Sequence, residues 1–147
     1  VNTQLNSFNS SFHSVSKYNK ADYICVHSGE LRHDYRNRND NITSLIKRLF
    51  KSSKSKFVTI TLGKEGSMVF NGNKFIHCPA FAQKIVDRVG AGDTLLAITS
   101  LCFAGGIDDR ITLLLGNLSA AETVATAGTG NRLNKTNLLK TVETLLK

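Results

Sequence analysis

The chain has 147 residues, a length typical of one compact domain with a single core. Its formal net charge of +8 favours an anionic partner, but the sign alone suits phosphates, nucleic acids and acidic membrane surfaces equally. The three cysteines, Cys25, Cys78 and Cys102, lie far apart among apolar residues, which predicts buried thiols in a reducing cytoplasm and argues against disulfides or structural zinc.

The first sixty residues predict a βαβ unit. Residues 1–20 are rich in Ser and Asn and open without Met, so we interpret them as a linker or as a helix of a preceding half. Residues 21–26, with the apolar run at 23–26, predict a strand, followed by a polar loop. Residues 41–50 predict an amphipathic helix, and the β-branched run at 57–61 predicts a second strand. Two strands joined through a helix run parallel, with a right-handed crossover.

The basic residues are concentrated in the second half of this helix and in the segment that follows it. They are Lys47, Arg48, Lys51, Lys54 and Lys56. Serines interrupt the cluster, and it lacks the aromatic residues that stack on single-stranded bases. We therefore expect a solvated face and no nucleic-acid partner. A nucleic-acid platform is the competing hypothesis, and its signature would be binding that weakens steeply with salt.

The second half predicts a hairpin and then helices. Asn71 and Gly72 favour a tight turn between strands at 67–70 and 74–77. The apolar pair Ile85 and Val86 predicts a strand that leads into a glycine-rich turn. The continuously apolar residues 94–104 predict a helix buried on most sides.

Helices are also expected at 109–127 and 135–146. The longest nearly apolar run, 95–104, is about half of the roughly 20 residues needed to cross a bilayer, so we expect no membrane partner. The order of elements predicts one α/β domain with a parallel sheet, an edge hairpin and terminal helices.

The clearest chemical signal is the segment 87–94, which reads DRVGAGDT. Glycines let the backbone approach an anion closely, and the N–H groups of a helix's first turn point at that anion. Asp93 in the same turn is suited to accept a proton from an attacking hydroxyl. An anion site beside a base predicts phosphoryl transfer. An isolated glycine turn is more often only a helix cap, and the flanking Asp87 and Asp93 reverse that preference.

This segment resembles the second signature of the ribokinase-like, PfkB-type carbohydrate kinases, D-[TS]-x-G-A-G-D, and departs from it at Arg88. The resemblance implies a three-layer, Rossmann-like α/β fold, of which residues 1–147 form the carboxy-terminal, nucleotide-binding half. It also implies ATP and Mg²⁺ as cofactors and a sugar or sugar phosphate as substrate. The amino-terminal half, with the lid through which such kinases form homodimers, would lie outside this chain.

The resemblance assigns roles to the residues of the signature. Asp93 would be the base that deprotonates the sugar hydroxyl. The amides of Gly90, Ala91 and Gly92 would form the anion hole. Asp87 and the backbone carbonyl of Val89 would hold a monovalent cation, K⁺.

Three further segments extend the resemblance. Residues 61–66, TLGKEG, match the family's T-x-G-x-x-G, which implies that Thr61 and Gly63 contact ATP and that Gly66 shapes the loop. Asn117 would lie near the adenine. In the N-x-x-E element that helps to place magnesium, Glu30 matches and His27 replaces the Asn.

Some alternatives remain open at the level of sequence. Among the subfamilies, the chain most resembles the heptose-phosphate kinases, while Arg88 instead resembles some ketodeoxygluconate kinases. His27, Arg88 or truncation could have left a catalytically degenerate nucleotide-binding module. Glu30 and His33 have the E-x-x-H spacing of two metal ligands on one helical face, but one such motif supplies too few ligands for a transition-metal site.

Overall fold

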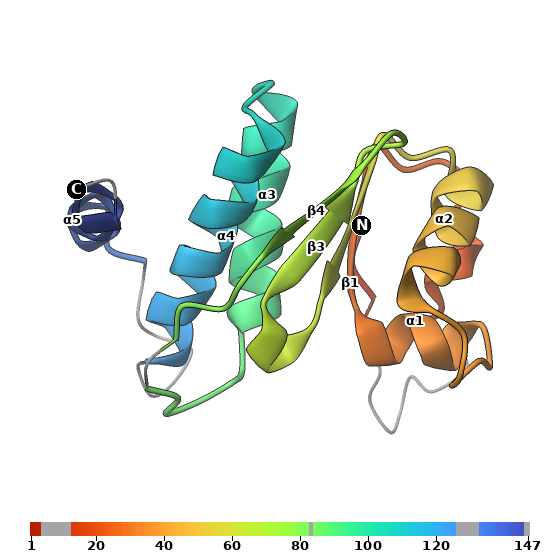
Figure 1. Ribbon diagram of the computed structural model, residues 1–147, viewed down its shortest axis with the longest axis horizontal. Helices are drawn as coiled ribbons and strands as arrows, with labels where there is room; N and C mark the ends of the chain where they lie inside the picture. Colours follow the sequence, from red (N-terminus) through yellow and green to blue (C-terminus); the bar gives the residue numbers. More distant parts are fainter. Residues whose placement is uncertain (4–12, 83, 126–132, 146–147) are drawn as a thin grey trace. The chain divides into compact units, whose positions relative to one another are not determined.

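The computed structural model describes residues 1–3, 13–82, 84–125 and 133–145. The chain divides into two compact units, Val1–His77 and Cys78–Lys147. Figure 1 traces the helices and strands in chain order.

A four-stranded mixed sheet forms the centre of the first unit. Its strands are β1 (Tyr23–His27), β2 (Phe57–Thr61), β3 (Ser67–Phe70) and β4 (Phe75–Cys78), in the order β1-β2-β3-β4. β1 and β2 are parallel, and their register runs from Tyr23 opposite Phe57 to His27 opposite Thr61. β2 and β3 are antiparallel. The predicted parallel crossover and edge hairpin are therefore both confirmed.

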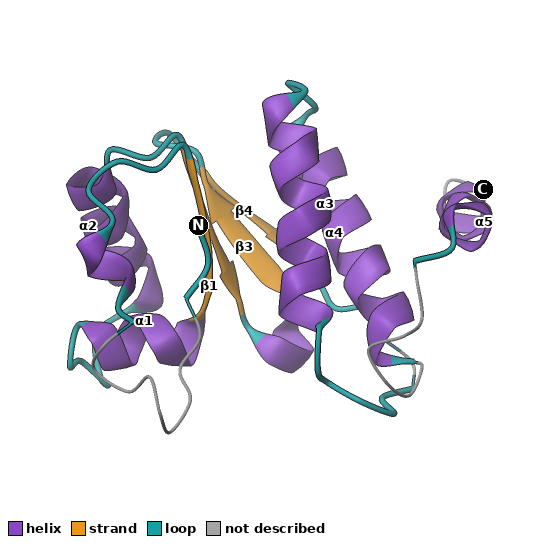
Figure 2. Cartoon of the chain, turned by 180° about the vertical axis from the view of Figure 1, so that it is seen from behind, coloured by secondary structure: helices purple, strands orange, loops and turns teal. Residues whose placement is uncertain are grey.

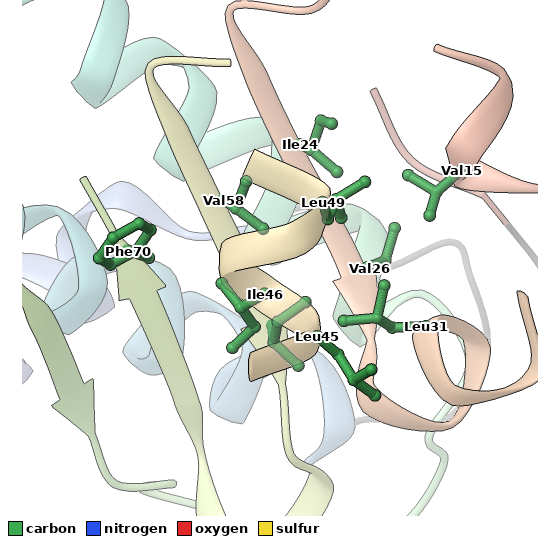
Figure 3. Close-up of a cluster of buried hydrophobic side chains, with 10 residues drawn as sticks. Val15, Ile24, Val26, Leu31, Leu45, Ile46, Leu49, Val58 and Phe70 are labelled. Carbon is green, nitrogen blue, oxygen red and sulfur yellow. The ribbon is translucent and has the colours of Figure 1, made fainter. Parts of the chain in front are cut away.

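The helical elements of the first unit pack on one face of this sheet (Figure 1). They are η1 (Val15–Lys17), α1 (Ser28–Asp34) and α2 (Ile42–Ser53), and a short 3-10 helix, η2 (Gly63–Glu65), follows β2. Figure 3 shows the apolar cluster between helices and sheet, in which Leu45, Ile46 and Leu49 of α2 meet Ile24 and Val58 of the strands. Because these α2 residues recur at helical spacing, they form one apolar stripe that faces the strands.

Helix α1 corrects the sequence analysis, which predicted a loop after the first strand. The side chain of His27 accepts a hydrogen bond from the N–H of Gly29 at 3.1 Å, and Glu30 accepts one from the N–H of His27 at 2.8 Å. This reciprocal pair is a capping box, which satisfies backbone donors at a helix start. The helix is short and polar, so periodicity did not reveal it.

The described residues of the second unit form three helices. They are α3 (Ala91–Ala104), α4 (Asp109–Val124) and α5 (Lys135–Leu145). α3 and α4 lie side by side and antiparallel (Figures 1 and 2). The backbones approach closely at Gly116, where a Cβ atom would lie 2.6 Å from the methyl carbon of Thr99. Among the described residues, no helix has both the length and the apolar character that crossing a bilayer demands.

The prediction that the apolar helix is buried on most sides was wrong. Leu95 and Thr99 are the buried residues of α3, while Leu101 is 72% exposed. Leu95 and Thr99 are one turn apart and face Gly116 of α4. The described part of the chain thus buries one stripe of α3, although most residues of this helix are apolar.

Candidate active site

A loop, not the strand predicted at Ile85 and Val86, leads into α3. The N–H groups of Val86 and Asp87 donate to the carbonyl oxygen of Val124, at 2.7 and 3.2 Å. Val124 is the last residue of α4, so these donors bond to a helix end and not to a neighbouring strand. Ile85 and Val86 are 44% and 46% exposed, which also differs from a buried strand.

The loop then makes a tight turn into the helix. The carboxylate of Asp87 accepts a hydrogen bond from the N–H of Val89 at 3.0 Å, which closes an Asx turn. Gly90 follows with φ of 83°, in the left-handed region that favours glycine. A Cβ at Gly90 would approach only Thr123, at an ordinary 3.8 Å. Glycine is therefore required here for its conformation and not for space.

The first turn of α3 contains Ala91, Gly92 and Asp93. No side chain caps this helix start among the residues that the structure describes, and a Cβ at Gly92 would meet no atom within 4 Å. First-turn N–H groups and the helix dipole attract an anion, and the space above Gly92 lets one approach. The Asp93 side chain is exposed in this same turn. Amide donors for an anion and a carboxylate that accepts protons are thus adjacent.

Helix α4 supports this helix start. The hydroxyl oxygens of Thr94 and Thr123 lie 3.0 Å apart in a hydrogen bond, and the Thr123 hydroxyl is also 3.0 Å from the carbonyl oxygen of Ser119. Thr123 thus bonds to the first turn of α3, and the carbonyl of Val124 bonds to the loop before it, so the end of α4 holds both segments. Sequence reasoning missed both residues. Nothing in their local pattern separates them from other residues of a helix.

Asn117 lies on the same helix with only 5% of its surface exposed. Its amide nitrogen donates to the carbonyl oxygen of Leu113 at 2.8 Å. Its side chain also hydrogen bonds with the thiol of Cys78, which partly offsets the larger effect of burial in raising the pKa of that thiol. The predicted adenine contact is thus a buried side chain with internal hydrogen bonds.

In the first unit, Thr61 ends β2 and the T-x-G-x-x-G segment forms the loop after it. Gly63 has φ of 62°, and a Cβ there would meet no atom within 4 Å. Gly66 has φ of 91° and ψ of −130°, and its carbonyl oxygen accepts a hydrogen bond from the N–H of Leu62 at 2.8 Å. The loop is therefore closed by its own backbone, and Gly63 presents an open surface.

The strand register brings Glu30 and this loop to the same edge of the sheet. His27 and Thr61 are partners at the carboxyl ends of β1 and β2. Glu30 lies in the first turn of α1, which follows β1 directly. In the second unit, Asp87, Val89 and residues 90–93 form one turn. Asn117 lies apart from that turn, on α4.

The described residues contain no group of three or more His, Cys, Asp or Glu side chains arranged to hold a metal. Glu30 is the one carboxylate in the α1 start. Magnesium keeps several waters and is commonly held by one or two carboxylates together with substrate phosphates. The donor set therefore fits magnesium shared with a bound nucleotide.

Comparison with known proteins gives the family. Residues 1–137 match the pfkB family of carbohydrate kinases. The bifunctional protein HldE of Koribacter versatilis is 33% identical over 118 residues, which are 78% of this chain and 24% of that protein. HldE of Helicobacter pylori is 26% identical over 116 residues, which are 77% of this chain and 25% of that protein. The chain spans about a quarter of the length of these relatives.

Solved kinases share the fold. Phosphofructokinase-2 from Escherichia coli, in complex with substrates and products, has a TM-score of 0.75 at 18% identity. The match covers 90% of this chain and 43% of the phosphofructokinase chain. Ribokinase from Thermotoga maritima has a TM-score of 0.71 at 21% identity, and the match covers 84% of this chain and 42% of the ribokinase chain. Arabidopsis thaliana ribokinase, complexed with ribose and ATP, has a TM-score of 0.73 at 25% identity, over 81% and 40%. The fold is ribokinase-like, and the chain belongs to the pfkB family of carbohydrate kinases.

Proposed function

We propose that this chain supplies the nucleotide-binding half of an ATP-dependent carbohydrate kinase, with Asp93 as its catalytic base. The observation that carries the proposal is the first turn of α3, where Gly92 leaves open space and Asp93 is exposed. The family match and the kinases with the same fold support a phosphotransferase that acts on a sugar hydroxyl.

In the proposed reaction, the hydroxyl oxygen of the sugar forms a bond to the γ-phosphorus of ATP. The bond from that phosphorus to the β,γ-bridging oxygen breaks, which releases ADP. The hydroxyl proton passes to the carboxylate of Asp93. The N–H groups of Gly90, Ala91 and Gly92 stabilise the negative charge that spreads over the transferred phosphoryl group.

The remaining residues bind the nucleotide and its cations. Thr61 and Gly63 line the phosphates, and the open surface at Gly63 supports this role. Glu30 orients magnesium through water, and that ion would neutralise charge on the phosphates. Asp87 and the carbonyl of Val89 would hold K⁺. The side chain of Asn117 stabilises α4 through its hydrogen bond to Leu113, and a direct contact between Asn117 and the adenine stays a prediction.

The decisive test is phosphoryl transfer by the full-length protein with Asp93→Asn as the variant. The panel contains ribose, fructose phosphates, ketodeoxygluconate and heptose phosphates, since the resemblance favours the last two groups. Asn keeps the shape of Asp but cannot accept the proton, so we expect kcat to fall by about 10²- to 10⁴-fold. Asp109→Asn is the matched control, because Asp109 also lies in the first turn of a helix.

Each outcome is informative. Equal losses in both variants would point to helix stability, since an acidic residue in a first turn contributes about 0.3 to 1 kcal/mol through the dipole. An unchanged kcat in Asp93→Asn would show that Asp93 is not the catalytic base. If the wild type binds ATP and phosphorylates nothing on the panel, the degenerate nucleotide-binding module becomes the better hypothesis.

A further inference from the structure

The start of α1 carries a residue that departs from the N-x-x-E pattern of the family. His27 stands where that pattern has Asn, and its imidazole occupies the N-cap position of the helix. Nδ1 of His27 accepts a hydrogen bond from the N–H of Gly29 at 3.1 Å. A ring nitrogen that accepts a hydrogen bond carries no proton, so the neutral ring bears its proton on Nε2.

Asn is among the preferred N-cap residues because its side-chain oxygen accepts from the first-turn N–H groups. Nδ1 of His and Oδ1 of Asn are separated from Cα by the same number of bonds. Both residues can therefore place an acceptor at the same point of the helix start. The departure from the pattern changes the residue type but keeps this acceptor.

The imidazole leaves little room for a side chain at Gly29. A Cβ atom at Gly29 would lie 3.1 Å from Nδ1 and 3.5 Å from Cε1 of His27. The ring thus lies directly over the Gly29 backbone, and a methyl group there would push it away. This close approach follows from the hydrogen bond between the two residues, so a side chain at position 29 would interfere with that bond.

The cap is coupled to Glu30. One carboxylate oxygen of Glu30, Oε2, accepts a hydrogen bond from the backbone N–H of His27 at 2.8 Å. The two hydrogen bonds are reciprocal, so loss of the imidazole acceptor loosens the turn that carries the carboxylate. His27 also pairs with Thr61 in the sheet, which places the cap beside the T-x-G-x-x-G loop.

We infer that His27 is a positioning residue, which replaces the Asn acceptor and orients Glu30 toward the magnesium of bound ATP. This inference rests on the proposed function for the role of Glu30. The cap itself depends only on the contacts of His27, Gly29 and Glu30. Residues that orient groups around a metal typically change metal affinity or activity by about 10- to 100-fold when they are removed.

The experiment measures the magnesium concentration for half-maximal rate in the full-length protein. We expect His27→Ala to raise it by about tenfold or more, and Gly29→Ala to raise it in the same direction. His27→Asn should restore the wild-type requirement. His33→Ala is the matched control, because His33 is an exposed histidine on the same helix outside the capping box. The nitrogen chemical shifts of the His27 ring, which separate the two tautomers, provide a readout independent of activity.

A ring with its proton on Nδ1 would overturn the inference whatever the activity. An unchanged magnesium requirement in a folded His27→Ala protein would overturn it as well, and so would failure of His27→Asn to restore the requirement. If the protein transfers no phosphate, the magnesium dependence of ATP binding replaces the rate in the same comparison. A full rate with Asp93→Asn would refute the proposed base and leave the test of His27 intact.

Discussion

Gly116 lies in the middle of α4 and is required for close packing of two helices. A Cβ there would come within 2.6 Å of Thr99 and 3.4 Å of Leu95. Gly116→Ala gains about 1 kcal/mol of helix propensity, but the added methyl forces the helices apart. Overpacking of this kind typically costs about 1 to 3 kcal/mol, so we expect a lower free energy of unfolding, measured by urea denaturation.

Gly92 gives the opposite expectation. Its Cβ would meet no atom of the described residues within 4 Å, so Gly92→Ala should leave the free energy of unfolding unchanged or raise it by up to about 1 kcal/mol. The same methyl would occupy the approach to the first-turn N–H groups, and ATP affinity should fall. Fluorescence titration with an ATP analogue measures this. Wild-type affinity in Gly92→Ala would exclude position 92 from the anion hole.

At the residue scale, the sequence pointed to the residues that are proposed to carry chemistry and not to those that support them. Gly90 and Asp93 could be proposed as site residues because glycines and an acid stand at fixed spacing in one short segment, and their roles stay predictions. Thr123 could not be predicted, since its role depends on a hydrogen bond to Thr94, which is distant in sequence. A single sequence contains no signal for such a partner.

At the element scale, α4 supports the candidate site, so its amino-terminal cap is a test of that support. The carboxylate of Asp108 accepts hydrogen bonds from the N–H groups of Arg110 and Ile111, at 2.9 and 3.3 Å. Asp108→Ala leaves these donors without the cap and should cost about 0.5 to 2 kcal/mol of stability. Asp108→Asn keeps an acceptor and should cost less. Thermal unfolding of both variants checks the order, and equal losses would assign the effect to charge.

The elements that were predicted correctly are those whose signal is local. α2 has a full apolar stripe and β2 a β-branched run, and both could be read directly. α1 was missed because a histidine cap is uncommon, although Glu30 at the third helical position was a usable signal. Ile85 and Val86 were misread, because an apolar pair does not reveal whether its N–H groups reach a strand or the end of α4.

At the scale of the whole molecule, the order of elements predicted more than their packing did. A parallel strand pair, a hairpin and consecutive helices define the fold class, and the segments at 61–66 and 87–93 that resemble the family's motifs follow one another along the chain. Burial depends on contacts between distant segments. The exposure of Leu101 in a helix whose residues are mostly apolar is the clearest case.

The buried thiol of Cys78 and the half-buried thiol of Cys102 make the stability of the molecule depend on pH, and Cys102 differs in this from the buried thiol that was predicted. Burial raises the pKa of Cys78 and Cys102, and hydrogen bonds to Asn117 and Thr112 lower it by less. The folded protein therefore keeps these thiols protonated over a range in which the unfolded chain ionises, near pH 8.5 and above. Their contribution to stability is complete below that pH and is lost as the pH rises through the raised values.

We expect the free energy of unfolding, measured with urea under reducing conditions from pH 7 to 10, to decline above about pH 8.5. A Cys78→Ala and Cys102→Ala double variant should be less stable throughout, because it leaves cavities, and should decline less steeply. Burial also raises the pKa of Tyr35, which adds a loss at higher pH that both proteins share. Only the difference between the two curves reports the thiols, so parallel curves would show that neither cysteine has the raised pKa that its burial implies.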